Sequence, residues 1–160
     1  MSKIQYLVIH CTATPEGREV TKKDIEQWHL IERGWSRVGY SDLIQLDGSL
    51  VGLTDYNQDD VKDPWEVTNG ASGYNSNSHH FVYSGGLTKY KPDNAHYWPS
   101  KDTRTQAQLD TMELYVKFFI KRHPLIKVIG HNQIAVKDCP SFDVPNWLRS
   151  ICINEINIGL

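Results

Sequence analysis

The chain has 160 residues, of which 39% are hydrophobic and 22% are charged. Such a chain can bury a core without covalent staples, so we expect a single domain over residues 1–160, with its core at about 3–152. The formal net charge is −2 and the Lys and Arg residues are scattered, which argues against a surface that binds nucleic acid or membrane. The three cysteines show no framework spacing, which argues against a disulfide scaffold.

The N-terminal segment, MSKIQYLVIH, lacks the apolar region and cleavage site of a signal peptide. The apolar stretches elsewhere are too short to span a bilayer. We therefore expect a protein that is made and kept in the cytoplasm. In that reducing compartment a cysteine is better suited to binding a metal than to forming a disulfide.

The first half of the chain predicts a strand, a helix and a hairpin. Residues 4–10 read as a strand in the centre of a sheet, because apolar residues occupy both of its faces. A weak capping-box pattern at Thr21 starts a helix of about three turns, which Gly34 ends. An Asp-Gly pair at 47–48 lies between two apolar runs within 38–54, and this is a strong signal for an antiparallel hairpin.

The middle of the chain predicts one strand between two polar loops. Residues 55–78 are rich in turn-forming residues and are assigned to loops. Residues 79–84 have the β-branched and aromatic content of a strand. The loop at 87–104 is long for a segment without structure of its own, which indicates a functional or partner-facing surface.

The last third of the chain predicts a helix, a strand and a second helix. A capping box at Thr105 and an apolar stripe predict a helix that ends at Pro124. A short strand at 127–130 follows, and Asp143 can cap a final helix that runs through Ile151. Strands and helices in this order favour an α/β fold, in which a mixed central β-sheet is flanked by helices.

Two histidines follow apolar runs of the same form. His10 ends the run YLVIH, and His131 follows VIG. If these runs are neighbouring strands, both imidazoles leave the sheet at the same edge. Cys139 follows in a polar loop between Lys137 and Pro140, which argues against burial for packing alone. Imidazole and thiolate are common zinc ligands, and a catalytic zinc takes three protein ligands, so these residues predict a zinc site.

The remaining cysteines and histidines have structural interpretations. Cys11 follows His10 on a strand and therefore points to the opposite face, and Cys152 belongs to the last helix, so we expect both in the core. His79 and His80 are adjacent and cannot both enter one site. No partner pattern assigns a function to three further histidines: His29, His96 and His123.

Seven segments together resemble the type 2 family of N-acetylmuramoyl-L-alanine amidases, whose fold is shared with peptidoglycan recognition proteins. They are VIHCTAT, IEQWHLIERGW, VGYSDLI, DGSLV, GYNSNS, DTRTQAQ and GHNQIAVKDCPSFD. The chain is most similar to the short single-domain phage lysozymes of that family. The resemblance implies a Zn²⁺ cofactor held by His10, His131 and Cys139. It also associates Tyr40, in the GY motif, and Lys137 with catalysis.

The resemblance implies hydrolysis of the amide between the lactyl group of muramic acid and L-alanine in peptidoglycan. The zinc would polarise the carbonyl, Lys137 would stabilise the oxyanion, and Tyr40 would donate a hydrogen bond or transfer a proton. The expected protein is a monomeric phage or prophage endolysin, a bacteriolytic enzyme that acts on the cell wall after release. Tyr74 and Asn75 are the expected contacts for the glycan or the stem peptide.

The sequence departs from the family pattern at three places. Ser41 follows the GY tyrosine where the family often has His. Asn69 and Gly70 precede GYN where many members carry a His. The next strand reads SHHFVYSGG in place of a pattern like SIGIxLVGG.

Three other functions fit the same sequence. A non-catalytic peptidoglycan-binding module of this fold is the main alternative, although such modules commonly lose the third zinc ligand and Cys139 is present. A zinc amidase that acts on another amide is the second, since a fold does not fix a substrate. A cytoplasmic recycling amidase, which would prefer soluble anhydro-muropeptides, is the third.

Overall fold

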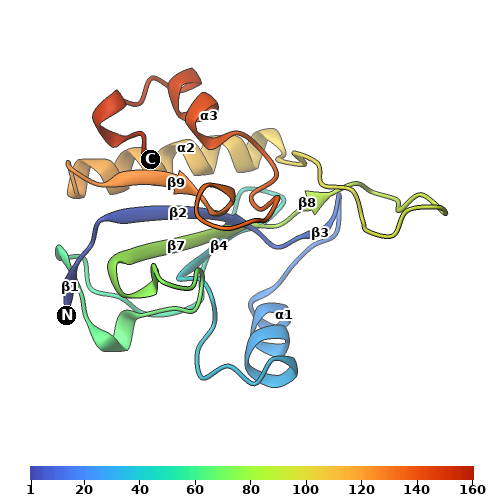
Figure 1. The fold of residues 1–160 in the computed structure, drawn as a ribbon, viewed down its shortest axis with the longest axis horizontal. Helices are drawn as coiled ribbons and strands as arrows, with labels where there is room; N and C mark the ends of the chain where they lie inside the picture. Colours follow the sequence, from blue (N-terminus) through green and yellow to red (C-terminus); the bar gives the residue numbers. More distant parts are fainter.

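Five strands form one mixed sheet in the computed structural model, which describes residues 1–160 (Figure 1). In spatial order they are β5 (Leu50–Gly52), β4 (Asp42–Ile44), β7 (Ser78–Tyr83), β2 (Tyr6–Cys11) and β9 (Lys127–Gly130). The last four run parallel, and β5 is antiparallel to β4. The predicted α/β fold with a mixed sheet is confirmed, as is the hairpin around residues 47–48, where Gly48 has a φ of 84°.

The sequence explains why β2 and β7 lie in the middle of this sheet. In β2, five of six residues are buried, and all six residues of β7 are buried. A strand that is apolar on both faces is stable only where both faces are covered, as in a parallel sheet between helices. The central position predicted for the first strand is therefore confirmed.

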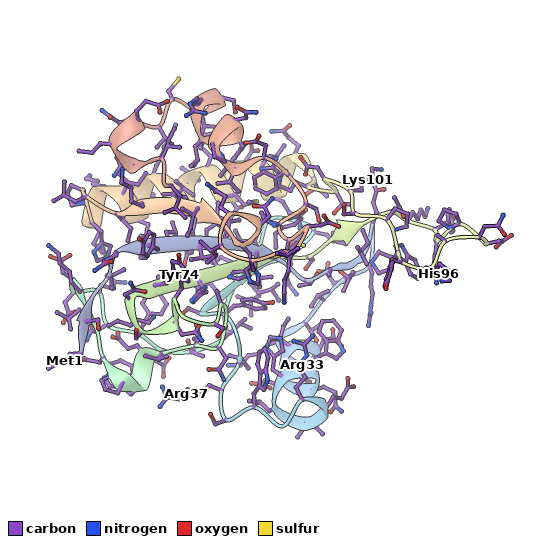
Figure 2. The ribbon with its side chains drawn as sticks, viewed as in Figure 1. Met1, Arg33, Arg37, Tyr74, His96 and Lys101 are labelled. Atoms are coloured by element: carbon purple, nitrogen blue, oxygen red, sulfur yellow. The ribbon has the colours of Figure 1, made fainter.

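Two pairs of very short strands extend the fold beyond the main sheet. The pair β1 (Ser2–Lys3) and β6 (Val61–Lys62) is antiparallel, and the pair β3 (Thr14–Pro15) and β8 (Gly86–Leu87) is parallel. Strands of two residues show no periodicity, which is why the sequence did not predict them. After β8 the chain leaves the body of the molecule, and Figure 2 shows His96 on this projecting segment.

Three α-helices and several shorter turns complete the fold. The helices are α1 (Lys22–Glu26), α2 (Gln106–Arg122) and α3 (Val144–Ser150). A π-helical segment, Gln27–Glu32, continues α1, and 3₁₀ turns occupy Pro64–Glu66, Asn75–Asn77, His131–Gln133 and Glu155–Asn157. The predicted capping boxes at Thr21 and Thr105 are confirmed, since each hydroxyl accepts a hydrogen bond from the backbone three residues later.

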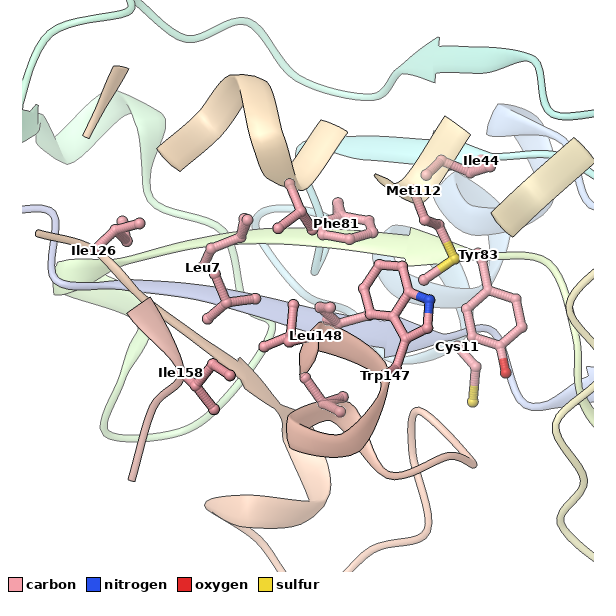
Figure 3. Packing of buried hydrophobic residues seen from close by; sticks show 14 residues of the cluster. Leu7, Cys11, Ile44, Phe81, Tyr83, Met112, Ile126, Trp147, Leu148 and Ile158 are labelled. Carbon is pink, nitrogen blue, oxygen red and sulfur yellow. The ribbon is translucent and has the colours of Figure 1, made fainter. Parts of the chain in front are cut away.

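The helices cover the two faces of the sheet and enclose two cores (Figure 1). Figure 3 shows the larger core, in which Leu7 and Phe81 of the sheet pack against Met112 of α2 and Trp147 of α3. The smaller core lies on the other face and includes Ile25 of α1. Burial of these apolar side chains holds both layers on the sheet.

One structural expectation for the cysteines is confirmed and one is wrong. Cys11 is buried, with 4% of its surface exposed. Cys152 is exposed, because α3 ends at Ser150 and the chain turns there with Cys152 at a φ of 63°. Among the helices, none has the length and apolar character needed to cross a membrane.

Candidate metal centre

The pairing of β2 with β9 brings His10 and His131 together. The two strands run parallel with Ile9 opposite Gly130, so the two histidines are the next residues on neighbouring strands. Their ring centroids lie 4.6 Å apart, and both side chains are buried. The prediction that the imidazoles emerge at the same edge of the sheet is therefore confirmed.

The loop after β9 returns over the end of β2 and adds Cys139. The backbone N–H of Cys11 donates a hydrogen bond to the Cys139 Sγ at 3.3 Å. The same sulfur lies 3.7 Å from the Nδ1 atom of His10. One donor atom from each of His10, His131 and Cys139 lies within 4.8 Å of the others.

This group has the chemistry that zinc requires, and one of its donor pairs also has the spacing. Zinc bonds of about 2.1 Å to nitrogen and 2.3 Å to sulfur, arranged tetrahedrally, place such donors about 3.6 Å apart. The separation of 3.7 Å between the His10 Nδ1 and the Cys139 Sγ agrees with this value. Two imidazoles and one thiolate leave one tetrahedral position for water or substrate, as in catalytic zinc sites.

Burial keeps both histidines neutral, which is the form that binds a metal. Burial, followed by the neighbouring His80, holds the pKa of His10 well below its usual value. Burial and the charge of Lys137 lower the pKa of His131 to about 4. The neighbouring Cys11 thiol and burial raise the pKa of Cys139, so a metal must displace the thiol proton when it binds.

Tyr40 lies directly beside the predicted ligands. Its ring centroid is 4.9 Å from that of His10. The preceding residue, Gly39, donates its backbone N–H to the Nδ1 of His29 at 3.0 Å, which fixes the chain at the GY motif. Burial and the nearby thiols, Cys139 first, raise the pKa of Tyr40, so its phenol keeps a proton that it can donate.

Lys137 is exposed on the loop that carries Cys139. Its backbone N–H donates to the carbonyl of Ala135 in a tight turn. Its charge contributes to the lowered pKa of His10 and of His131, so the ammonium acts on both ligands. The candidate centre therefore combines three predicted metal ligands with one phenol donor and one cation.

Comparison with known proteins shows the family of the chain. The sequence model of the N-acetylmuramoyl-L-alanine amidase family matches residues 1–142. The chain belongs to this family. The endolysin of Escherichia phage T7 is 29% identical over 141 residues, which are 88% of this chain and 83% of the relative.

Two solved structures share the amidase fold with this chain. The N-acetylmuramoyl-L-alanine amidase LysC from Clostridium intestinale superposes with a TM-score of 0.70 at 17% identity, over 95% of this chain and 87% of the other. Peptidoglycan recognition protein LE, in complex with the monomeric peptidoglycan tracheal cytotoxin, superposes with a TM-score of 0.62 at 19% identity. That match covers 86% of this chain and 74% of the other.

In this member of the amidase family, Tyr74 and Asn75 lie apart from the metal group. The ring of Tyr74 packs edge-on against Tyr6 at 5.4 Å, and Tyr6 begins β2 whereas His10 lies near its end. Four residues of strand separate the two ends by about 13 Å. The Asn75 Oδ1 accepts the backbone N–H of Ala71, which shapes the loop before β7.

Sequence reasoning missed one residue of the centre, His80. It lies in β7 opposite Val8, and its Nδ1 is 3.0 Å from the Nε2 of His10. The adjacent pair His79-His80 did indicate that only one of the two could enter a site on a given face. Which histidine does so depends on how β7 pairs with β2, and the sequence does not state that register.

Proposed function

We propose that this chain is a zinc-dependent N-acetylmuramoyl-L-alanine amidase, which hydrolyses the amide between the muramic acid lactyl group and L-alanine in peptidoglycan. The observation that carries the proposal is the group of His10, His131 and Cys139, whose donor atoms lie within 4.8 Å of one another. Membership of the amidase family and similarity to a phage endolysin support the same reaction.

The ligands supply a site in which the metal keeps an open position. When bound, zinc supplies Lewis acidity, which polarises a carbonyl and makes water a sufficient nucleophile near neutral pH. His10 and His131 offer neutral nitrogens because burial lowers their pKa values. Cys139 adds a thiolate, whose negative charge attracts a divalent cation more strongly than a neutral ligand would.

Lys137 and Tyr40 act on the charges that develop as the amide breaks. Attack on the carbonyl carbon places negative charge on the carbonyl oxygen, and the Lys137 ammonium is held on the ligand loop where it can stabilise that charge. Tyr40 keeps its proton at neutral pH and lies beside His10. Its phenol can therefore donate a hydrogen bond to the same oxygen or transfer a proton to the leaving amine.

The proposed partner is peptidoglycan, through both the glycan and the stem peptide. The complex of recognition protein LE with a monomeric peptidoglycan supports this choice of ligand class for the fold. Tyr74 and Asn75 remain the predicted substrate contacts. From their place beside the start of β2, they would bind a part of the polymer away from the scissile amide.

The proposed role is that of a phage or prophage endolysin. The similarity to the endolysin of phage T7 supports this role. Such a protein is made in the cytoplasm and acts on the cell wall after release.

A non-catalytic peptidoglycan-binding module is the second candidate. The similarity to peptidoglycan recognition proteins favours it, because that group shares the fold. The enzyme is preferred because Cys139 completes a three-ligand set and because Tyr40 and Lys137 accompany that set.

The deciding experiment measures release of L-alanine N-termini from purified peptidoglycan, together with bound zinc, in the wild type, Cys139→Ala and Cys152→Ala. Cys152→Ala is the matched control, since its thiol is exposed and lies outside the metal group. We expect about one zinc per chain and full activity in the wild type and the control. We expect loss of both in Cys139→Ala. Zinc binding without amine release would overturn the proposal and favour the binding module.

Metal removal should also lower the stability of the fold, because the ligands come from distant parts of the chain. Zinc at about 100 times its Kd adds about 2.7 kcal/mol to the free energy of unfolding, which raises the Tm of a chain of this size by about 5–10 °C. A chelator should therefore lower the Tm of the wild type by this amount. The Tm of Cys139→Ala should not respond to the chelator.

A further inference from the structure

His80 is placed by the sheet against a predicted metal ligand. It is opposite Val8 in the pairing of β7 with β2, so its side chain shares a face with that of His10, two residues further along β2. The side chain of His80 is completely buried, and its Nδ1 lies 3.0 Å from the Nε2 of His10. The distance is that of a hydrogen bond between the two rings.

The loop before β7 is shaped to admit the His80 imidazole. A Cβ atom at Gly70 would lie 2.5 Å from the Nδ1 of His80 and 2.7 Å from the carbonyl oxygen of Gly39. A side chain at position 70 would therefore clash with the His80 ring and with the backbone of Gly39. Glycine at this position leaves room for the imidazole.

The hydrogen bond assigns the two nitrogens of His10 to different partners. The Nδ1 faces the Cys139 Sγ at 3.7 Å, whereas the Nε2 is directed to His80. A neutral imidazole that binds a metal through Nδ1 carries its proton on Nε2 and can donate it. The His80 Nδ1 must then accept the hydrogen bond that the His10 Nε2–H donates. An accepting Nδ1 carries no proton, so neutral His80 carries its proton on Nε2.

We propose that His80 is a positioning residue, which holds His10 in the tautomer and ring orientation that present Nδ1 to the metal. The proposal rests on the proposed zinc amidase function. Partners of this kind are usually carboxylates, backbone carbonyls or waters, and their removal typically weakens metal binding by about 10–100-fold. Here the imidazole of His80, on the neighbouring strand β7, acts as that partner.

A purely structural role for His80 makes a different prediction. A buried polar ring is costly unless it is hydrogen-bonded, and the Nε2 of His80 has no protein partner. If His80 only filled space, an apolar side chain of similar size would pack as well or better, and metal affinity would not change. The two roles are therefore separated by zinc affinity and not by stability.

The test compares His80→Asn with His80→Leu, two variants of nearly the same shape. The Asn side-chain oxygen can replace the His80 Nδ1 as an acceptor, whereas Leu offers none. We expect the Kd for zinc, measured by competition with a chromogenic chelator, to rise about 10–100-fold in His80→Leu. The Kd of His80→Asn should stay close to that of the wild type. His79→Leu is the matched control, because His79 lies on the opposite face of β7 and should leave the Kd unchanged.

Equal zinc affinity in the wild type and in a folded His80→Leu would overturn the proposal. A measurement on the wild type alone covers the case in which His80→Leu does not fold. In ¹⁵N NMR spectra of the zinc-loaded protein, we expect His10 to carry its proton on Nε2 and His80 to be unprotonated at Nδ1. A His10 proton on Nδ1 would also overturn the proposal. If the wild type binds no zinc, the proposed amidase function itself fails, which is a separate result.

Discussion

The two faces of the central sheet use adjacent histidines of β7 in different ways. On the face covered by α2, the Nε2 of His79 lies 2.8 Å from the hydroxyl of Tyr115. On the other face, the Nδ1 of His80 lies 3.0 Å from His10. Both rings are buried, and burial lowers the pKa of each. Since residue type and burial are the same, the partner alone distinguishes a structural histidine from one beside the metal centre.

On the face covered by α2, Asp42 is the centre of a small network of hydrogen bonds. The hydroxyls of Tyr56 and Tyr115 donate to the Asp42 Oδ2 at 2.8 and 2.6 Å. Burial alone would raise the pKa of Asp42, but the neighbouring His79 and the hydrogen bonds from both tyrosines outweigh it and lower the pKa. His79 has a pKa of about 4, so its contact with Asp42 at 3.8 Å is not an ion pair at neutral pH. Changes on this face should therefore alter the free energy of unfolding. Changes on the opposite face, called the metal face because it carries His10 and His80, should alter zinc binding and turnover.

The largest expected effect is that of Lys137→Met on the metal face. Loss of the cation that stabilises the oxyanion should lower kcat by about 10²–10³-fold. Zinc content and Tm should not change, because Lys137 is exposed and is not a ligand. Lys23→Met, which changes an exposed lysine on α1, is the matched control for peptidoglycan turnover assays. An unchanged kcat in Lys137→Met would show that this residue takes no part in the mechanism.

The next largest effect is expected for Asp42→Ala, on the face covered by α2. Removal of this buried carboxylate leaves the Tyr56 and Tyr115 hydroxyls without their acceptor. The free energy of unfolding, measured in urea, should fall by about 3 kcal/mol, while the Kd for zinc stays the same. The control is Asp93→Ala, which removes an exposed carboxylate. Weaker zinc binding without a loss of stability would contradict the division between the two faces.

The smallest expected effect, taken per pH unit, is a change in how stability depends on pH. His79 has a folded-state pKa of about 4, against an ordinary value of 6.5. Between these pH values the unfolded chain binds a proton that the folded chain excludes, so stability should fall as the pH falls from 6.5 to 4. His79→Leu in the metal-free protein should reduce this slope by at most about 1.4 kcal/mol per pH unit. An unchanged slope would mean that His79 is protonated in the folded protein.

Much of the fold and the grouping of His10, His131 and Cys139 could be predicted because their signals are local. Apolar runs place β2 and β9, and each run ends at the histidine that the edge of the sheet exposes. Capping boxes at Thr21 and Thr105 each lie within four consecutive residues. Such features need no knowledge of distant pairing, so the sequence alone was enough.

The features that were missed depend on contacts between distant segments. The hydrogen bond between His10 and His80 joins residues 70 positions apart, and it forms only in one register of β7 against β2. The exposure of Cys152 depends on where α3 ends, and apolar periodicity continues through Ile151 although the helix stops at Ser150. The burial of Lys62 likewise follows from the pairing of β6 with β1. Strands of two residues leave no sequence pattern from which that pairing could be predicted.

The separation of the ligands along the chain has a consequence for synthesis. His10 and Cys139 are 129 positions apart, and β9 joins the sheet only after β2, β4 and β7 have been made. A ribosome must therefore translate most of the message before any product can bind the metal through all three ligands. Chains that terminate before Cys139 should be inert toward the wall of the cell that makes them. Translation itself would thus delay the proposed lytic activity until the polypeptide is nearly complete.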